Sequence, residues 1–223
     1  MTERLAELQP LLDQPPSVSA FEQILARLDD WPAPELEAVI AHVEAALQRW
    51  PDEARCAGEQ LLSEGPDGAV RVKAYAVLVR RLEFEPSHAG CEPWLIVLIA
   101  RAPELRNLTI LNLPCEDVEG VGAEAIASST TLSKLKQLRL GDRIDDGGLC
   151  AIANSTAFPQ LELLELRGWI SDDETAEVLA NSPLMTKLVA LNLEDDGLSE
   201  DGYRALAESP FIPAFLAPTT ASV

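Results

Sequence analysis

The sequence predicts an α/β fold, a right-handed solenoid in which a curved parallel sheet carries helices on its convex side. The string LxxLxL occurs four times, starting at Leu108, Leu135, Leu161 and Leu188, with steps of 27, 26 and 27 residues. An alanine keeps the same spacing, at Ala100, Ala127, Ala153, Ala180 and Ala207. Self-similarity at a fixed period of this length is typical of a solenoid.

Each repeat reads as a strand followed by a helix, and the period and the string together are typical of leucine-rich repeats. In LVALNL, side chains alternate across the strand, so Leu191 and Leu193 face the core while Asn192 faces the other side. Ser199 is placed to cap the next helix, and the small alanine lets that helix lie close to the sheet. We therefore expect parallel strands near 79–84, 109–113, 136–140, 162–166 and 189–193, with helices near 92–101, 121–128, 147–154, 173–181 and 200–208.

The chain divides into three parts. Residues 1–77 are expected to form an all-helical N-terminal domain that covers the open end of the repeats, as a solenoid requires. Residues 78–215 are the solenoid, with LVRRLEF opening one divergent repeat ahead of the four clear ones, and 216–223 are a tail. Helical periodicity interrupted by proline predicts helices at 3–13, 18–30, 34–49 and 52–63.

Three smaller features complete the organisation of the chain. Trp31 and Trp50 are interpreted as core residues under the N-terminal helices. GPDG at 65–68 predicts a turn and not a phosphate-binding loop, since no GK[ST] follows it. At the carboxyl end, either Phe211, Phe215 and Leu216 fold back over the last repeat or another protein covers it.

The composition restricts the classes of partner. The formal net charge is −20, which disfavours binding to nucleic acid or to anionic lipid and favours basic partners at low salt. The longest strongly apolar run, at 94–100, is far shorter than the ~20 residues that span a bilayer. The amino terminus lacks the pattern of a secretory signal, so we expect a cytoplasmic protein with reduced thiols and no membrane partner.

No motif predicts catalysis, a cofactor or a metal. The four cysteines have no CxxC spacing, and His42 and His88 lie in no catalytic motif. Acidic clusters such as Asp145–Asp146 and Asp172–Glu174 are interpreted as helix caps and a solvated edge, because carboxylates are favoured at helix N-termini. We expect a protein that is not an enzyme.

The repeats resemble the ribonuclease-inhibitor-like class of leucine-rich repeat proteins, most closely in LSEDGYRALAESP. They are also similar to a large bacterial set whose repeats read as strand, I-x-D-x-G, then ALA-S-P, and AALQRWPDEAR followed by LVRRLEF resembles the lead-in to such repeats. The resemblance covers 45–215 and implies a protein-binding fold without catalytic residues. The chain departs from the usual asparagine-ladder position, which holds Glu116 and Asp196.

Analogy with other repeat folds favours the concave sheet face as the recognition surface. Alternation assigns to it Arg81, Glu83, Ile110, Asn112, Gln137, Arg139, Leu163, Glu165, Arg167, Ala190, Asn192 and Glu194. The rim positions beside it are Asp117, Arg143, Trp169 and Gly197. The predicted partner-binding residues are Arg139, Arg143, Leu163, Glu165, Arg167, Trp169, Asn192 and Glu194.

Trp169 has two interpretations. Tryptophan and arginine are enriched among interface hot spots, so Trp169 and Arg143 at the rim are candidate anchors. Alternatively, Trp169 folds down and packs against neighbouring turns. On the face itself, adjacent strands lie ~4.8 Å apart, so Arg139 and Glu165 are expected to contact one ligand side chain together.

Two functional hypotheses follow. The first is a non-enzymatic scaffold or adaptor that binds a protein through the concave face and rim. The alternative is an inhibitor or immunity protein that blocks a basic enzyme such as a nuclease, which the charge of −20 favours. Partner identity and oligomeric state stay open.

Overall fold

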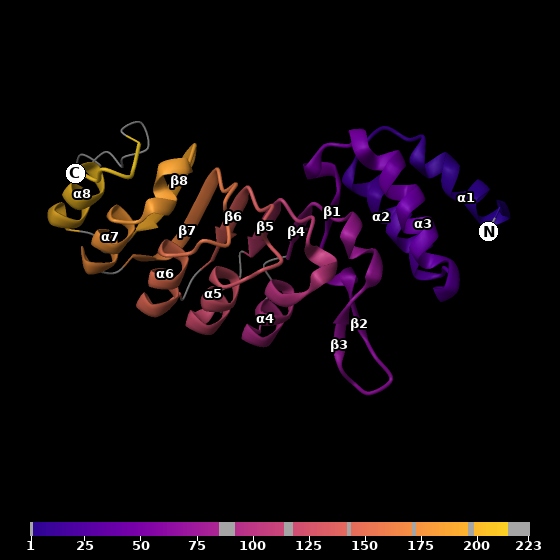
Figure 1. Ribbon diagram of the computed structural model, residues 1–223, viewed down its shortest axis with the longest axis horizontal. Coiled ribbons are helices and arrows are strands. Elements are labelled where there is room, and N and C mark those ends of the chain that lie inside the picture. The colour runs from indigo at the N-terminus through magenta and orange to yellow at the C-terminus, as the bar shows by residue number, and fades with distance from the viewer. Residues whose placement is uncertain are drawn as a thin grey trace.

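The computed structural model describes residues 2–84, 92–113, 118–141, 144–170, 173–195 and 199–213, and for 2–3, 167–170 and 193–195 it describes the backbone alone. Within these residues the chain is an α/β protein with eight α-helices and a six-stranded parallel sheet (Figure 1). The N-terminal helices lie at one end of the sheet, and the C-terminal strand and helix lie at the other.

The chain begins with three helices, α1 (Thr2–Leu12), α2 (Val18–Asp29) and α3 (Ala33–Ala46), and α3 runs into a 3-10 turn at Leu47–Arg49. They match the helices expected at 3–13, 18–30 and 34–49. Ser17 caps α2 by accepting a hydrogen bond from the amide of Ala20. Trp31 and Trp50 are both buried, which confirms the prediction that they belong to the core.

The helix predicted at 52–63 is wrong, and with it the expectation that 1–77 is all helical. This segment forms 3-10 turns at Asp52–Ala54 and Glu59–Leu61 around strand β1 (Cys56–Ala57), and then enters β2 (Leu62–Glu64). The reason is tertiary, because the Arg55 carbonyl accepts hydrogen bonds from the amides of Arg80 and Arg81 at 3.0 and 3.1 Å. Pairing with the sheet overrides local helix propensity here.

Strand β2 pairs antiparallel with β3 (Val70–Val72), and together they form a hairpin that projects from the fold (Figure 1). The GPDG segment is the turn of this hairpin, as predicted. Gly68 closes it with a φ of 76°, a conformation that favours glycine, and its amide donates to the Gly65 carbonyl at 2.9 Å.

The large sheet has the order β1-β4-β5-β6-β7-β8, and all of its pairings are parallel. Its remaining strands are β4 (Arg81–Glu83), β5 (Ile110–Leu113), β6 (Gln137–Leu140), β7 (Leu163–Ile170) and β8 (Ala190–Asp195). Strands β4 to β6 lie within the predicted segments, and β7 and β8 begin in theirs and extend beyond them. Neighbouring strands pair leucine with leucine, so that Leu82, Leu111, Leu138 and Leu164 form one buried line. The strands therefore carry the LxxLxL leucines into the core.

Strand β7 is longer than the predicted 162–166, because it continues to Ile170 through an irregularity in its pairing with β8. Trp169, which was expected at the rim beyond the strand, accordingly lies in the extended end of β7.

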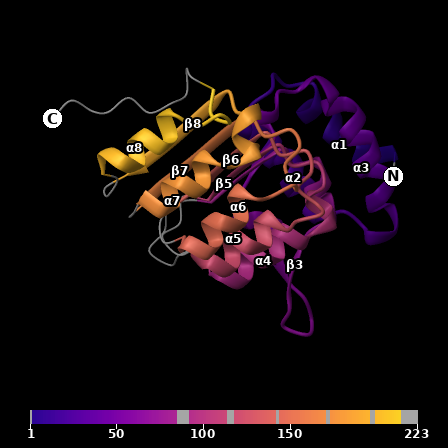
Figure 2. The same cartoon turned by 60° about the vertical axis from the view of Figure 1, so that its left-hand side comes forward.

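Five helices follow the strands: α4 (Pro93–Arg101), α5 (Glu119–Ala127), α6 (Asp146–Ala153), α7 (Asp173–Ala180) and α8 (Glu200–Ala207). They match the predicted ranges and lie side by side along one face of the sheet (Figures 1 and 2). Two predicted caps are confirmed, since Asp145 accepts from the Gly148 amide at 2.8 Å and Ser199 accepts from the Asp201 amide at 3.1 Å.

A serine follows each of the helices α5 to α8 and forms a hydrogen bond to the preceding repeat. The hydroxyls of Ser129, Ser155, Ser182 and Ser209 donate to the carbonyls of Ala100, Ala127, Ala153 and Ala180 respectively. The acceptors are the recurring alanines, and the first two bonds measure 2.5 and 2.6 Å. The serine that ends one helix thus satisfies a carbonyl at the end of the helix before it.

Helices α5 and α6 approach so closely that one glycine is required between them. A Cβ on Gly148 would lie 2.8 Å from both Ala123 Cβ and Ile144 Cγ2. Gly148→Ala is therefore expected to destabilise the fold by about 1–3 kcal/mol, although alanine favours a helix. Gly147→Ala is the matched control, because its new Cβ would lie 3.5 Å from the nearest atom, Asp145 Oδ1, and it should stabilise by up to about 1 kcal/mol.

Urea unfolding of the two glycine variants measures both effects. Equal stability of the two variants would contradict the close contact between α5 and α6.

At the carboxyl end of the described residues, Ile212 is buried and Phe211 packs against the core. Phe215 and Leu216, which were expected to fold back over the last repeat, lie outside the described residues. None of the described helices combines the length and the apolar character needed to cross a membrane.

Candidate protein-binding face

The face of the sheet opposite helices α4 to α8 carries two rows of side chains, set by the parallel register. The first row is Arg81, Ile110, Gln137, Leu163 and Ala190, and the second is Glu83, Asn112, Arg139, Glu165 and Asn192. These residues alternate with the buried leucines, so they point to the other side of the sheet. Most of them are half-buried, and Asn192 is exposed. This surface is called the open face below.

The charged residues of the open face are paired with one another. Arg81 forms an ion pair with Glu83, which also accepts a hydrogen bond from Asn112 Nδ2 at 2.6 Å. On the next two strands, Arg139 Nε donates to Glu165 Oε2 at 3.1 Å. The two arginines balance the two glutamates, so the described part of this face is neutral in a chain whose net charge is −20.

Glu165 is at the centre of this arrangement. Its exposure is only 8% because it lies between Arg139 and Asn192 on the adjacent strands. A carboxylate removed from water in this way is held by its arginine partner, which fixes both side chains in place. The pair places a charged donor and a charged acceptor side by side on the open face.

The structure brings four of the eight predicted binding residues together. Arg139 and Glu165 are in contact, Leu163 lies beside Gln137 and Ala190, and Asn192 is next to Glu165. The predicted adjacency of Arg139 with Glu165 is therefore confirmed.

The other four predicted binding residues are Arg143, Arg167, Trp169 and Glu194. Arg167 and Glu194 are partners in the register of β7 and β8, and Trp169 is placed by its backbone alone. Arg143 lies outside the described residues. Both interpretations of Trp169, packed against neighbouring turns or available to a partner, stay predictions.

The predicted set omitted the N-terminal part of the open face. Arg81 begins the first row on β4, and Glu83 and Asn112 begin the second row. The register of LVRRLEF with the next strand was the signal that placed them there. Cys56 extends the first row beside Arg81, and no sequence signal predicted it because β1 is only two residues long and lacks the leucine string.

The titratable groups around the open face do not form a reactive centre in the described residues. Burial raises the pKa of the Cys56 thiol, so the thiol stays protonated at neutral pH, although Arg81 acts in the opposite direction. Farther along the sheet, hydrogen bonds from the Ser199 hydroxyl and amide lower the pKa of Asp173, which ties the start of α7 to the cap of α8. Within the described ranges, no three His, Cys, Asp or Glu side chains gather closely enough to hold a metal ion.

Comparison with known proteins assigns no family to the chain. No protein-family model matches the sequence, and no curated protein matches it. A functional conclusion therefore rests on the geometry of the open face.

Proposed function

We propose that the chain is a leucine-rich repeat solenoid of the ribonuclease-inhibitor-like class, and that it acts as a non-enzymatic scaffold or adaptor. In this proposal the open face is the concave face of the solenoid, and it binds another protein together with the rim that carries Trp169. The observation that carries the proposal is the pair of continuous rows across five parallel strands, in which most residues are half-buried and the charged ones are paired.

The chemistry of this surface suits protein recognition. Leu163 in the first row is half-buried and offers apolar contact, while Arg139 and Glu165 in the second row offer a donor and an acceptor that are already paired. Side chains that are ordered before binding lose less conformational entropy when a partner docks. A partner surface with a small apolar centre and polar surroundings fits the open face.

The alternative, an inhibitor of a basic enzyme, is supported by the net charge of −20. Capture of a basic protein by this face requires carboxylates that are free to pair with it, however. Glu83 and Glu165 are already paired with Arg81 and Arg139. The scaffold is therefore the better supported function, and an affinity that depends only weakly on salt is expected.

The test begins with capture of the partner from the native cell and its identification by mass spectrometry. Leu163→Asp should then weaken the binding of that partner by about 30-fold or more, because it places an unpaired charge in the centre of the face. Glu177→Ala, an exposed change on the opposite side of the sheet, is the matched control and should leave the affinity unchanged.

Three results would contradict the proposal or change it. Equal affinity of Leu163→Asp and Glu177→Ala would move the site away from the open face. A steep loss of affinity between low and physiological salt would favour the inhibitor. Turnover that survives repurification and disappears with a point substitution in this chain would make it an enzyme.

A further inference from the structure

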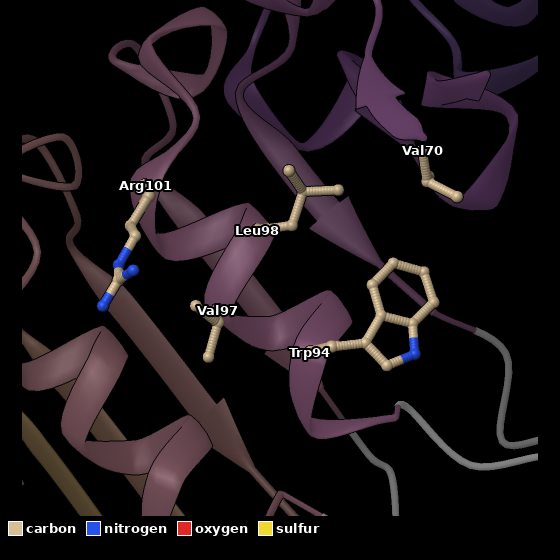
Figure 3. A pocket seen from close by; sticks show the side chains of 5 residues that line it. All are labelled: Val70, Trp94, Val97, Leu98 and Arg101. Atoms are coloured by element: carbon tan, nitrogen blue, oxygen red, sulfur yellow. The ribbon is translucent and has the colours of Figure 1, made fainter. Parts of the chain in front are cut away.

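An apolar groove lies on the helical side of the molecule, away from the open face. Four residues of α4 line it, and Val70 of the β2–β3 hairpin faces them across the groove (Figure 3). The helical residues are Trp94, Val97, Leu98 and Arg101. Their spacing of i, i+3, i+4 and i+7 is one stripe of a helix. The groove encloses about 520 Å³, and Trp94 is 52% exposed.

This stripe is specific to α4, as the other repeats show. Counting from the recurring alanine, the positions equivalent to Trp94 are Val121, Gly147, Glu174 and Asp201. Those equivalent to Val97 are Glu124, Cys150, Glu177 and Arg204. Both positions thus become small or charged in most of the helices that follow. The apolar character of α4 at these positions is not a requirement of the repeat itself.

The position of α4 explains why the stripe has no helical neighbour. Helices α5, α6 and α7 each lie between two others, whereas α4 has α5 on one side and the β2–β3 hairpin on the other (Figures 1 and 2). At this end of the row, among the described residues, the hairpin and not a helix lies beside α4. The side chains of an added helix would enter the groove between α4 and Val70.

Arg101, at one end of the groove, indicates which charge a bound partner should carry there. Eight other arginine or lysine side chains form ion pairs, but within the described residues Arg101 has no hydrogen-bonding or ionic partner. In a chain with 37 acidic residues, an unpaired arginine beside an apolar groove offers a site for a carboxylate.

We propose that this groove binds an amphipathic α-helix of another protein. That helix presents apolar side chains at i, i+3, i+4 and i+7 to Trp94, Val97 and Leu98, and an Asp or Glu to Arg101. A second copy of this chain is a poorer occupant, because two molecules of charge −20 repel each other. The groove is separate from the open face and would serve a second partner of the scaffold.

The test uses the full chain and two synthetic helical peptides of about 18 residues. Both carry leucine at i, i+3, i+4 and i+7; one has glutamate next to the leucine stripe and the other has lysine there. Fluorescence anisotropy of the labelled peptides at about 0.15 M salt should show tighter binding of the glutamate peptide. This preference opposes the overall negative field of the protein, so it reports on Arg101.

Three variants locate the binding. Leu98→Glu should weaken binding of the glutamate peptide by about tenfold or more, and Arg101→Glu should reverse the preference in favour of the lysine peptide. Val121→Glu is the matched control, since it occupies the equivalent of the Trp94 position on α5 and is 60% exposed, and it should change nothing. Melting curves of Arg101→Glu and Val121→Glu should stay close to that of the unmodified chain. Leu98 also packs against the core, so binding by Leu98→Glu is measured well below the melting temperature of that variant.

Three outcomes would overturn the proposal. These are failure of both peptides to bind, a preference for the lysine peptide in the unmodified chain, and equal effects of Leu98→Glu and Val121→Glu. Self-association in sedimentation equilibrium that Leu98→Glu abolishes would instead assign the groove to a second copy. Leu163→Asp should not affect peptide binding, so failure here is distinguishable from failure of the open face.

Discussion

Replacing Glu44 with alanine is expected to lower the free energy of unfolding by about 3 kcal/mol. Glu44 on α3 accepts hydrogen bonds from both Arg55 and Arg80, each at 2.5 Å, and Arg55 also donates from Nε to the Leu78 carbonyl. Arg55 is only 3% exposed, so the variant leaves a buried guanidinium without its carboxylate. Glu44 itself is 34% exposed, which allows water to compensate in part and places the effect at the lower end of the usual range.

The network around Glu44 connects the N-terminal helices to the sheet. Burial and the neighbouring charge of Arg55 lower the pKa of Arg80, and the Glu44 carboxylate opposes that shift. Removing Glu44 therefore sets two like charges beside each other just before strands β1 and β4, where the sheet begins. The loss should be visible as earlier unfolding in urea.

Glu7→Ala is the matched control for this prediction. Glu7 pairs with Arg27 at 3.6 Å, and both side chains are more than half exposed, so its loss should cost less than about 1 kcal/mol. Similar midpoints for the two variants would mean that the Glu44 network does not connect the helices to the sheet.

The second large effect is expected for Ser182→Ala, at about 2–4 kcal/mol. The Ser182 hydroxyl is buried, donates to the Ala153 carbonyl and accepts from the Leu184 amide at 3.2 Å. Alanine leaves both backbone groups unpaired in the interior, and each unpaired group costs about 1–3 kcal/mol. Thermal or urea unfolding measures the loss.

Ser155→Ala provides the comparison, because Ser155 makes the same pair of bonds, to Ala127 and from Ala157, at a half-buried position. Water can reach these groups, so a cost of about 1 kcal/mol is expected. If Ser155→Ala destabilised as much as Ser182→Ala, local geometry would govern the effect instead of burial.

The repeated part of the chain was predicted closely because its pattern is periodic. The strands at 110–113 and 137–140 and the helices α5 to α8 lie where the LxxLxL string and the recurring alanine place them. The adjacency of Arg139 and Glu165 also followed from the repeat, because one period brings equivalent residues onto adjacent strands. The hydrogen bonds from serine hydroxyls to alanine carbonyls could not be predicted from the repeat. The sequence shows which residues recur but not which of their atoms are in contact.

The spacing of the repeats predicts the α/β class, the parallel order of the strands and the residues of the open face, and this spacing can be read without knowledge of distant contacts. Tertiary structure sets the conformation of 52–63, where pairing of β1 with β4 outweighs helix propensity. It also decided that the charges of the open face are paired and that the stripe from Trp94 to Arg101 faces a groove. Both outcomes depend on which side chains remain uncovered after packing, and local sequence does not encode that.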